Sequence, residues 1–324
     1  MATRKKAKSK LRANKSKAPA KKPATRPMKS AAKKSAKKTV KVAAKNPAAK
    51  SANGNGLPRP SSMPWGQAGR ALDGVRILID PVWDKRAAPM QWTGPKRFFP
   101  PPLALENLPP IDAVLISHDH FDHLGAGTVQ QLARMDSLQR TRWLTPLGVG
   151  SILARLGVAP AQTAELDWTE QVKIGPVNIT ALPARHFSGR SLFNRSQTLW
   201  ASFALIGPKH RVYYGADSGE WFGFKEIGER FGPFDITMLE IGASDPLWRD
   251  IHMGPEGAVR SFRALGGHGL LMPIHWGLFD LALHHWQQPI KDVDAVEGLK
   301  LWSPTPGIPS EVIRGQELRS NWWR

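Results

Sequence analysis

The sequence predicts a layered α/β or α+β domain behind a disordered basic tail, and two observations support this fold class. From residue 61 to residue 324, short apolar runs alternate with helical patterns, as expected for sheets covered by helices. Residues 1–60 instead form a low-complexity stretch of Lys, Ala, Ser and Pro with few large apolar side chains. Ordering such a stretch would cost backbone entropy with no burial to offset it, so we expect it to be disordered.

Charge divides the chain in the same place. The 324 residues carry 46 Lys and Arg against 26 Asp and Glu, and 21 of the basic residues fall within residues 1–72, which hold no acidic residue. The folded part is therefore close to neutral, which excludes a basic nucleic-acid-binding domain there. The absence of cysteine excludes a disulfide scaffold, a thiolate zinc site, an iron–sulfur cluster and a thiol nucleophile.

The tail is predicted to be a polyanion-binding arm for DNA, RNA or an anionic membrane surface, because each neutralised phosphate releases counterions. Two alternatives stay open: a solubilising extension without a partner, and an organelle transit peptide, although such peptides favour Arg over the Lys found here. The sequence shows no secretory signal and no apolar run of about 18 residues. We therefore expect a cytoplasmic protein that the tail associates with the nucleoid or a membrane surface.

The expected elements follow a linker at residues 53–56, which leads into the folded part together with Pro58 and Pro60. Short apolar runs predict strands at 75–79, 113–116, 143–145, 177–182, 199–206, 211–214, 236–241 and 270–274. Helical patterns predict helices at 127–135, 149–156, 224–231 and 255–265. The last of these has proline in its first turn and two glycines after its end.

The most informative motif is a cluster of three histidines and two aspartates directly after the strand predicted at 113–116. It reads Ser117-His118-Asp119-His120-Phe121-Asp122-His123. Imidazole and carboxylate are the ligands suited to Zn²⁺ and neighbouring divalent ions. Where a strand gives way to a loop, successive side chains can point to two sides, so this one segment could serve two adjacent metals.

Three further candidates each follow an apolar strand later in the chain: His186, Asp217 and His275. Taken singly, each is more often a hydrogen-bonded core or loop residue than a metal ligand. Together with the dense motif they predict a site for two divalent metal ions, with Zn²⁺ the expected ion.

The order of these residues resembles the signature of the metallo-β-lactamase superfamily. Other segments are similar to the branch that contains N-acyl-phosphatidylethanolamine-hydrolysing phospholipase D and its bacterial relatives, among them Asp80-Pro81-Val82-Trp83, Leu166-Asp167-Trp168 and Ile274-His275-Trp276-Gly277. The resemblance spans residues 73–290 and implies a four-layer αββα sandwich with the metals at one edge. It departs from that branch at Phe121, usually Tyr, at Gly125, usually acidic, at Ser218, usually Thr, and at Gly254, usually Asn.

The resemblance also implies roles for individual residues. His118, His120 and His186 would hold one zinc, Asp122, His123 and His275 the other, and Asp217 would bridge them. His252 is the candidate for protonating or orienting a leaving group. Asp80 and Asp119 are candidates for orienting a ligand imidazole, with ordinary turn carboxylates as the alternative. Candidates for phosphate binding are Lys96, Arg97, Arg185 and Arg190, with salt bridges inside the domain as the alternative.

Two metals sharing a water would make hydroxide available near neutral pH. The resemblance then implies a phosphodiesterase of phospholipase D type, acting on a phospholipid or another phosphodiester. The metal motif alone also fits a lactonase or a nuclease of the same superfamily. A nucleic-acid-binding protein with an inactive domain is the alternative from outside the enzymes, and the complete set of seven predicted ligands argues against it.

Overall fold

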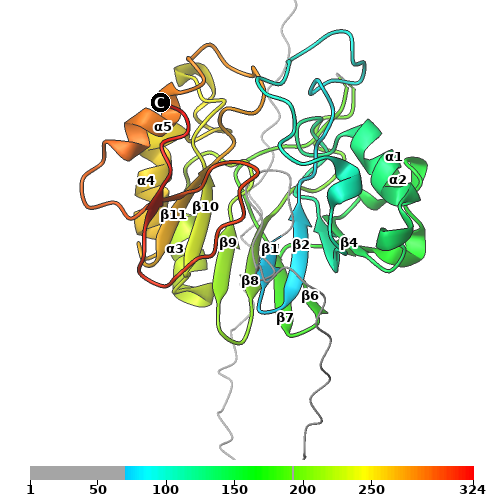
Figure 1. The fold of residues 1–324 in the computed structure, drawn as a ribbon, viewed down its shortest axis with the longest axis horizontal. Helices are drawn as coiled ribbons and strands as arrows, with labels where there is room; N and C mark the ends of the chain where they lie inside the picture. Colours follow the sequence, from blue (N-terminus) through cyan, green and yellow to red (C-terminus); the bar gives the residue numbers. More distant parts are fainter. Residues whose placement is uncertain (1–69, 192) are drawn as a thin grey trace, which may run out of the picture. The chain divides into compact units, whose positions relative to one another are not determined.

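The structure is a computed structural model that describes residues 70–191 and 193–324. The predicted tail at residues 1–60 and its linker lie outside the described residues. Among those described, two large β-sheets pack face to face, and helices cover both outer faces (Figure 1). This arrangement confirms the predicted α+β fold with four layers.

The first sheet has the strand order β1-β2-β3-β4-β5. Strands β2 to β5 are parallel to their neighbours, and β1 is antiparallel to β2. The strands are β1 (Arg70–Leu72), β2 (Val75–Ile79), β3 (Ala113–Leu115), β4 (Arg142–Pro146) and β5 (Thr163–Leu166). All three residues of β3 are buried, as expected for a parallel strand covered on both faces.

The second sheet has the strand order β11-β10-β9-β8-β7-β6. Strands β9, β10 and β11 run parallel to one another, while β6 to β9 form an antiparallel meander. The strands are β6 (Gln171–Ile174), β7 (Val177–Leu182), β8 (Ser202–Ile206), β9 (Arg211–Tyr214), β10 (Ile236–Glu240) and β11 (Leu270–Ile274). A short pair, β12 (Trp302–Ser303) and β13 (Leu318–Arg319), follows near the C-terminus.

Three apolar clusters fill the spaces between the layers. One lies between the sheets and takes residues such as Ile77 and Leu115 from the first and Ile179 and Met272 from the second. Helices α1 (Ala126–Arg134) and α2 (Gly150–Arg155) cover the outer face of the first sheet. Helices α3 (Gly223–Phe231), α4 (Gly254–Ala264) and α5 (Gln288–Asp294) cover the second. No helix of the described ranges is long and apolar enough to cross a membrane.

The carboxyl ends of the parallel strands in both sheets meet at one edge of the sandwich, where β2, β3, β9, β10 and β11 all end (Figure 1). Loops beyond these ends are where ligands bind in open α/β sheets. The strand predicted at 199–206 begins later, at Ser202, because the preceding residues belong to such a loop. There the Ala201 N–H donates to the carbonyl of Ser117, in the segment after β3, rather than to a neighbouring strand (3.0 Å).

Candidate metal centre

All seven predicted ligands gather at this edge. Four come from the loop after β3 (His118, His120, Asp122 and His123), and the others follow β7 (His186), β9 (Asp217) and β11 (His275). Their donor atoms form two groups, within each of which all atoms lie within 4.8 Å of one another. Asp217 belongs to both groups, so a single carboxylate lies between the two sets of donors.

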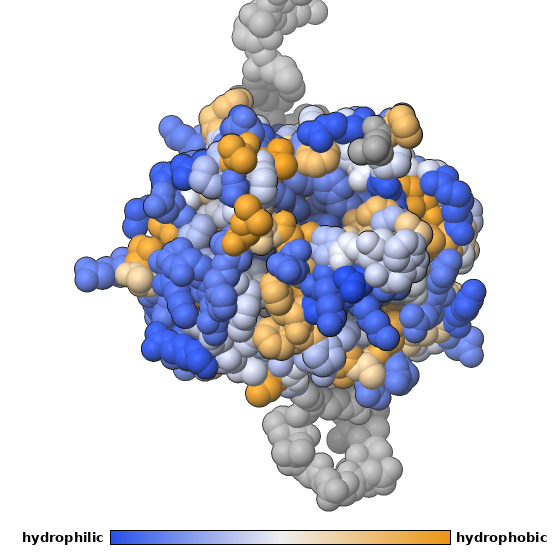
Figure 2. Space-filling model, turned by 90° about the horizontal axis from the view of Figure 1, so that it is seen from above, coloured by the Kyte–Doolittle hydropathy of each residue, from blue (hydrophilic) through white to orange (hydrophobic). Residues whose placement is uncertain are grey.

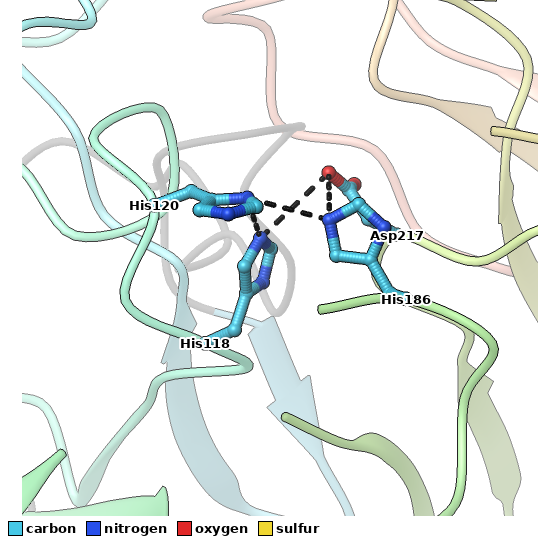
Figure 3. Close-up of side chains that lie close together, drawn as sticks. All are labelled: His118, His120, His186 and Asp217. Atoms are coloured by element: carbon cyan, nitrogen blue, oxygen red, sulfur yellow. Dashed lines mark hydrogen bonds and ion pairs between the residues drawn. The ribbon is translucent and has the colours of Figure 1, made fainter. Parts of the chain in front are cut away.

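The first group consists of His118, His120, His186 and Asp217, whose side chains point toward one another from three separate loops (Figure 3). His118 Nε2 lies 2.8 Å from His120 Nδ1, and His186 Nε2 lies 3.3 Å from the same atom. The Oδ2 atom of Asp217 lies 3.8 Å from His118 Nε2 and 3.7 Å from His186 Nε2. Three imidazole nitrogens and one carboxylate oxygen therefore surround a common centre.

The second group consists of Asp122, His123, Asp217 and His275. His275 Nε2 lies 3.1 Å from Asp122 Oδ2 and 3.3 Å from Asp217 Oδ1. His123 Nε2 lies 3.1 Å from Asp217 Oδ2. The Oδ2 atom of Asp217 thus faces His123 of this group as well as His118 and His186 of the first, while Oδ1 faces His275.

Some donor atoms of this centre are buried without a hydrogen-bond partner among the described residues. They include His123 Nε2 and Asp217 Oδ1. Buried polar atoms are almost always hydrogen-bonded, so such atoms in a native fold indicate a missing partner. A divalent cation bound between these atoms would supply it, and the residues present therefore fit a metal.

Protonation states differ between the two groups. In the second group burial lowers the pKa of His123 and His275, but the charge of Asp217 raises both above the usual value, so these rings would release a proton on binding a cation. The first group agrees with a metal site. Burial, followed by the neighbouring imidazoles, lowers the pKa of His118 well below its usual value, and burial lowers that of His186 to about 3. Burial raises the pKa of Asp217, but the charges of His123 and His275 outweigh it and hold that pKa well below its usual range. Neutral imidazole and ionised carboxylate are the forms that bind metals.

The backbone is strained where it delivers these side chains. His275 at the end of β11 has φ 60°, and Asp80 after β2 and Ala216 before Asp217 have φ 40° and 51°. Residues other than glycine rarely adopt this region, and such strain concentrates at functional sites. Gly242 makes the turn of His275 possible, because a Cβ at that position would lie 2.1 Å from the carbonyl oxygen of His275.

Asp80 lies directly behind His123. Its Oδ2 atom is 2.7 Å from His123 Nδ1, and Asp80 also accepts hydrogen bonds from the backbone N–H of Ser117 (2.7 Å) and from the hydroxyl of Tyr214. A carboxylate at the distal nitrogen fixes the tautomer and orientation of a ligand imidazole. Asp80 thus has the geometry predicted for it.

Asp119 has a different contact from the one predicted. Its Oδ1 atom accepts a hydrogen bond from the backbone N–H of Gly189 at 2.6 Å, and the side chain is buried. The carboxylate therefore binds the loop that carries His186 and orders that loop rather than an imidazole ring. Nδ1 of His186 lies instead 3.0 Å from the carbonyl oxygen of Ile251, which leaves Nε2 for the centre.

His252 stacks on the centre and is held by a residue that the sequence did not single out. Its ring lies 5.4 Å from that of His275 and 5.2 Å from that of His186, between ring centroids. Its Nδ1 atom is 2.5 Å from Oε2 of Glu240, a completely buried carboxylate at the end of β10. Burial lowers the pKa of His252, but the charge of Glu240 and this hydrogen bond raise it to about 9. In the metal-free protein His252 therefore keeps its proton at neutral pH.

Arg97 does not have the exposed guanidinium that the phosphate-binding prediction needs. The residue is buried, and its Nη2 atom donates to the carbonyl of Val82 at 2.5 Å. Burial lowers its pKa to about 10. The neighbouring Lys96 is exposed on the loop after β2. Arg97 thus fastens this loop, which corrects the predicted role.

Arg185 and Arg190 are also engaged within the domain. Arg185 forms an ion pair with Asp250 at 2.6 Å, as the salt-bridge alternative described. Arg190 donates from Nη1 to the carbonyls of Asp119 (2.6 Å) and Leu124 (2.8 Å), and so joins the loop after β7 to the metal-motif loop. Both guanidinium groups therefore bind partners within the domain, in the loops around the metal centre.

Comparison with known proteins agrees with this geometry. A family model for the beta-lactamase superfamily domain matches residues 75–276. An uncharacterized protein of Mycobacterium tuberculosis is 45% identical over 258 residues, which cover 78% of this chain and 68% of that protein. The N-acyl-phosphatidylethanolamine-hydrolyzing phospholipase D 1 of Caenorhabditis elegans is 35% identical over 244 residues, which cover 71% of this chain and 68% of that enzyme.

A solved structure shows the same fold. The metallo hydrolase Igni18 of Ignicoccus hospitalis superposes with a TM-score of 0.53 at 21% identity, covering 73% of this chain and 90% of that one. The predicted family and enzyme class are thereby confirmed. This chain belongs to the metallo-β-lactamase superfamily and is a hydrolase of that fold, related to the N-acyl-phosphatidylethanolamine-hydrolysing phospholipases D.

Proposed function

We propose that this protein is a phosphodiesterase of phospholipase D type, which uses two divalent cations, Zn²⁺ as the expected ion, to hydrolyse lipids like N-acyl-phosphatidylethanolamine. The observation that carries the proposal is the shared carboxylate Asp217, which faces both donor groups. Its support comes from the 35% identity to a phospholipase D over most of the chain.

The two donor groups would hold one cation each. His118, His120, His186 and Asp217 would bind the first, and Asp122, His123, Asp217 and His275 the second. When bound, such a pair of cations activates water near neutral pH and stabilises negative charge on a phosphoryl oxygen. Asp80 would hold the His123 ring with Nε2 toward the second group.

His252 is suited to protonate the leaving oxygen of the head group. The buried Glu240 engages Nδ1 and raises the pKa of His252 to about 9, so the ring keeps its proton at neutral pH. Stacking on His275 and packing against His186 hold the ring beside both donor groups. A general acid held in this way contributes about 10²- to 10⁴-fold to the rate.

The chain differs from the phospholipase branch at Gly125, directly before α1. A Cβ at Gly125 would lie 2.2 Å from Oδ2 of Asp84, whose carboxylate accepts hydrogen bonds from the backbone N–H groups of Gly127 and Thr128 at the start of α1. Asp84 thus occupies the space that an acidic side chain at 125 would need. We expect this chain to hydrolyse the same phosphodiester bond as the phospholipase branch but to prefer a different head group.

A substrate panel tests the proposal. The zinc-loaded protein is incubated with N-acyl-phosphatidylethanolamine, phosphatidylethanolamine, an acyl lactone and single-stranded DNA, and products are followed by mass spectrometry and ³¹P NMR. We expect phosphatidic acid and an N-acylethanolamine from the first substrate, with no product from an Asp217→Asn control. Faster opening of the lactone, or DNA cleavage, would replace the proposal with the lactonase or nuclease alternative.

The tail is proposed to hold this hydrolase at a polyanionic surface. The 21 basic residues among residues 1–72 have no acidic residue among them, so they would neutralise phosphates of an anionic membrane or a nucleic acid. Because the proposed substrate is a membrane lipid, an anionic membrane surface fits the tail's partner better than a nucleic acid does.

A further inference from the structure

A large apolar cavity adjoins the metal centre. It encloses about 600 Å³, within the range of small-molecule binding sites. Its walls come from the loop after β2, the segment after β11, the loop after β12 and the C-terminus, with Phe99, Trp286, Trp322 and Trp323 among the lining residues. Figure 2 looks down on the face with the strand ends, where hydrophobic residues are interspersed among hydrophilic ones.

The cavity and the metal centre share His275. This residue lines the cavity while its Nε2 atom faces Asp122 and Asp217. A second, smaller cavity of about 30 Å³, enough for about one water molecule, is lined by both Asp122 and His275. The two cavities share His275, Trp276 and Trp286 as walls, so the larger cavity lies beside the one at the predicted metal ligands.

The aromatic residues of the walls pack against one another. Trp322 stacks on Trp276 and Trp286, with ring centroids 5.1 and 5.9 Å apart, and Phe99 meets Trp286 edge-on at 5.1 Å. The C-terminal segment that supplies Trp322 is tied to α5 by an ion pair between Arg324 and Asp294, 2.9 Å apart. A preformed apolar cavity binds an alkyl chain without first having to be ordered.

Charge narrows the class of ligand further. The cavity walls contain Arg97 and Arg324 but no acidic residue. Neither guanidinium is free, since Arg97 donates to the carbonyl of Val82 and Arg324 pairs with Asp294, so the walls favour an uncharged apolar chain over an ammonium group. Exposed apolar side chains also lie on the loops after β2 and β11, Trp92 at 75% and Leu283 at 92% exposure.

We propose that this cavity binds one fatty acyl chain of the substrate lipid while the phosphodiester lies at the metals. The inference rests on the proposed function for its account of the phosphodiester. It adds that chain length is selected by the aromatic walls and by the C-terminal tryptophans. Each further buried methylene is expected to strengthen binding about threefold to fourfold.

A binding experiment tests the cavity without catalysis. The full chain, freed of metal by chelation, is titrated with ω-brominated octanoate, decanoate and dodecanoate, and quenching of tryptophan fluorescence is followed. We expect saturable quenching with a dissociation constant that falls with chain length. Thr305→Phe, which fills the cavity from its half-buried wall, should weaken dodecanoate binding at least tenfold. Gln131→Phe adds the same ring at an exposed position on α1 and is the matched control.

The outcomes separate the two proposals. Equal quenching of wild type and Thr305→Phe, or quenching that does not depend on chain length, would overturn the acyl site. If Thr305→Phe fails to fold, Trp322→Ala, which removes one wall, must reduce the dependence on chain length instead. Chain-length-dependent binding in a protein that hydrolyses no phosphodiester would keep the cavity as a lipid site and reject the proposed reaction. Phosphodiester hydrolysis with equal kcat/KM for six- and twelve-carbon acyl chains would keep the proposed reaction and reject the acyl site.

Discussion

Replacing Asp217 by asparagine tests whether two metal positions share this carboxylate or are independent of each other. Asp217 is one of four donors in each group, with one oxygen 3.1 Å from His123 Nε2 and the other 3.3 Å from His275 Nε2. Loss of a residue that merely orients a ligand weakens metal binding 10- to 100-fold. Loss of a direct donor should therefore weaken it at least about 100-fold, or about 2.7 kcal/mol, at each position.

The measurement is metal content after equilibration in a zinc buffer. We expect close to two ions per chain for the wild type, and loss of both from Asp217→Asn. Asp122→Asn, which belongs only to the second group, should lose one. Asp119→Asn is a matched control, because this buried carboxylate hydrogen-bonds Gly189 and lies outside both groups. Two ions bound by Asp217→Asn with wild-type affinity would refute the bridging geometry.

Four further outcomes are expected. Chelation should lower the melting temperature, and Zn²⁺ should restore it; at a Zn²⁺ concentration 100 times the dissociation constant the free energy of unfolding should rise by about 2.7 kcal/mol. A melting temperature that does not change with zinc would contradict the site. His252→Gln should lower kcat about 10²- to 10⁴-fold at unchanged metal content, and metal loss would instead make His252 a ligand. The pKa of His186 is about 3 in the folded protein and about 6.5 in the unfolded chain, so between these pH values only the unfolded chain binds the extra proton. The free energy of unfolding of the metal-free protein should therefore fall as the pH drops from about 6.5 to about 3. Urea titrations at several pH values measure this fall, and His186→Gln should make it smaller. Deleting residues 1–60 should weaken binding to anionic vesicles or DNA and make that binding less dependent on salt, while turnover of bis(p-nitrophenyl) phosphate stays unchanged. Unaltered binding would mean that the tail is a solubilising extension.

The sequence predicted the central strands well because they are buried on both faces. Runs rich in apolar residues, interrupted by polar residues such as Arg76 in β2 and Asn178 in β7, mark β2, β7, β9 and β11, whose bounds agree with the prediction. Strands β5 and β6 escaped notice because they are half-exposed and lack such runs. Helix α5 has only three buried residues in its seven, too few for a visible periodicity.

The candidate site was predictable as far as each residue follows a strand. Glu240 follows the same rule, but a single carboxylate after an apolar run resembles an ordinary strand end. Its role becomes visible only when folding brings it 2.5 Å from His252. The apolar cavity could not be predicted at all, because its walls come from four segments between residues 97 and 324 that share no pattern.

The donors are divided between the two sheets, and this has a consequence for how the enzyme comes into being. Neither sheet alone supplies a complete group, because the loop after β3 must meet those after β7, β9 and β11. A nascent chain released before residue 275 would lack the last imidazole of the second group. Hydrolytic activity should therefore emerge only when synthesis and packing are both complete, and a partly synthesised chain should not hydrolyse any substrate.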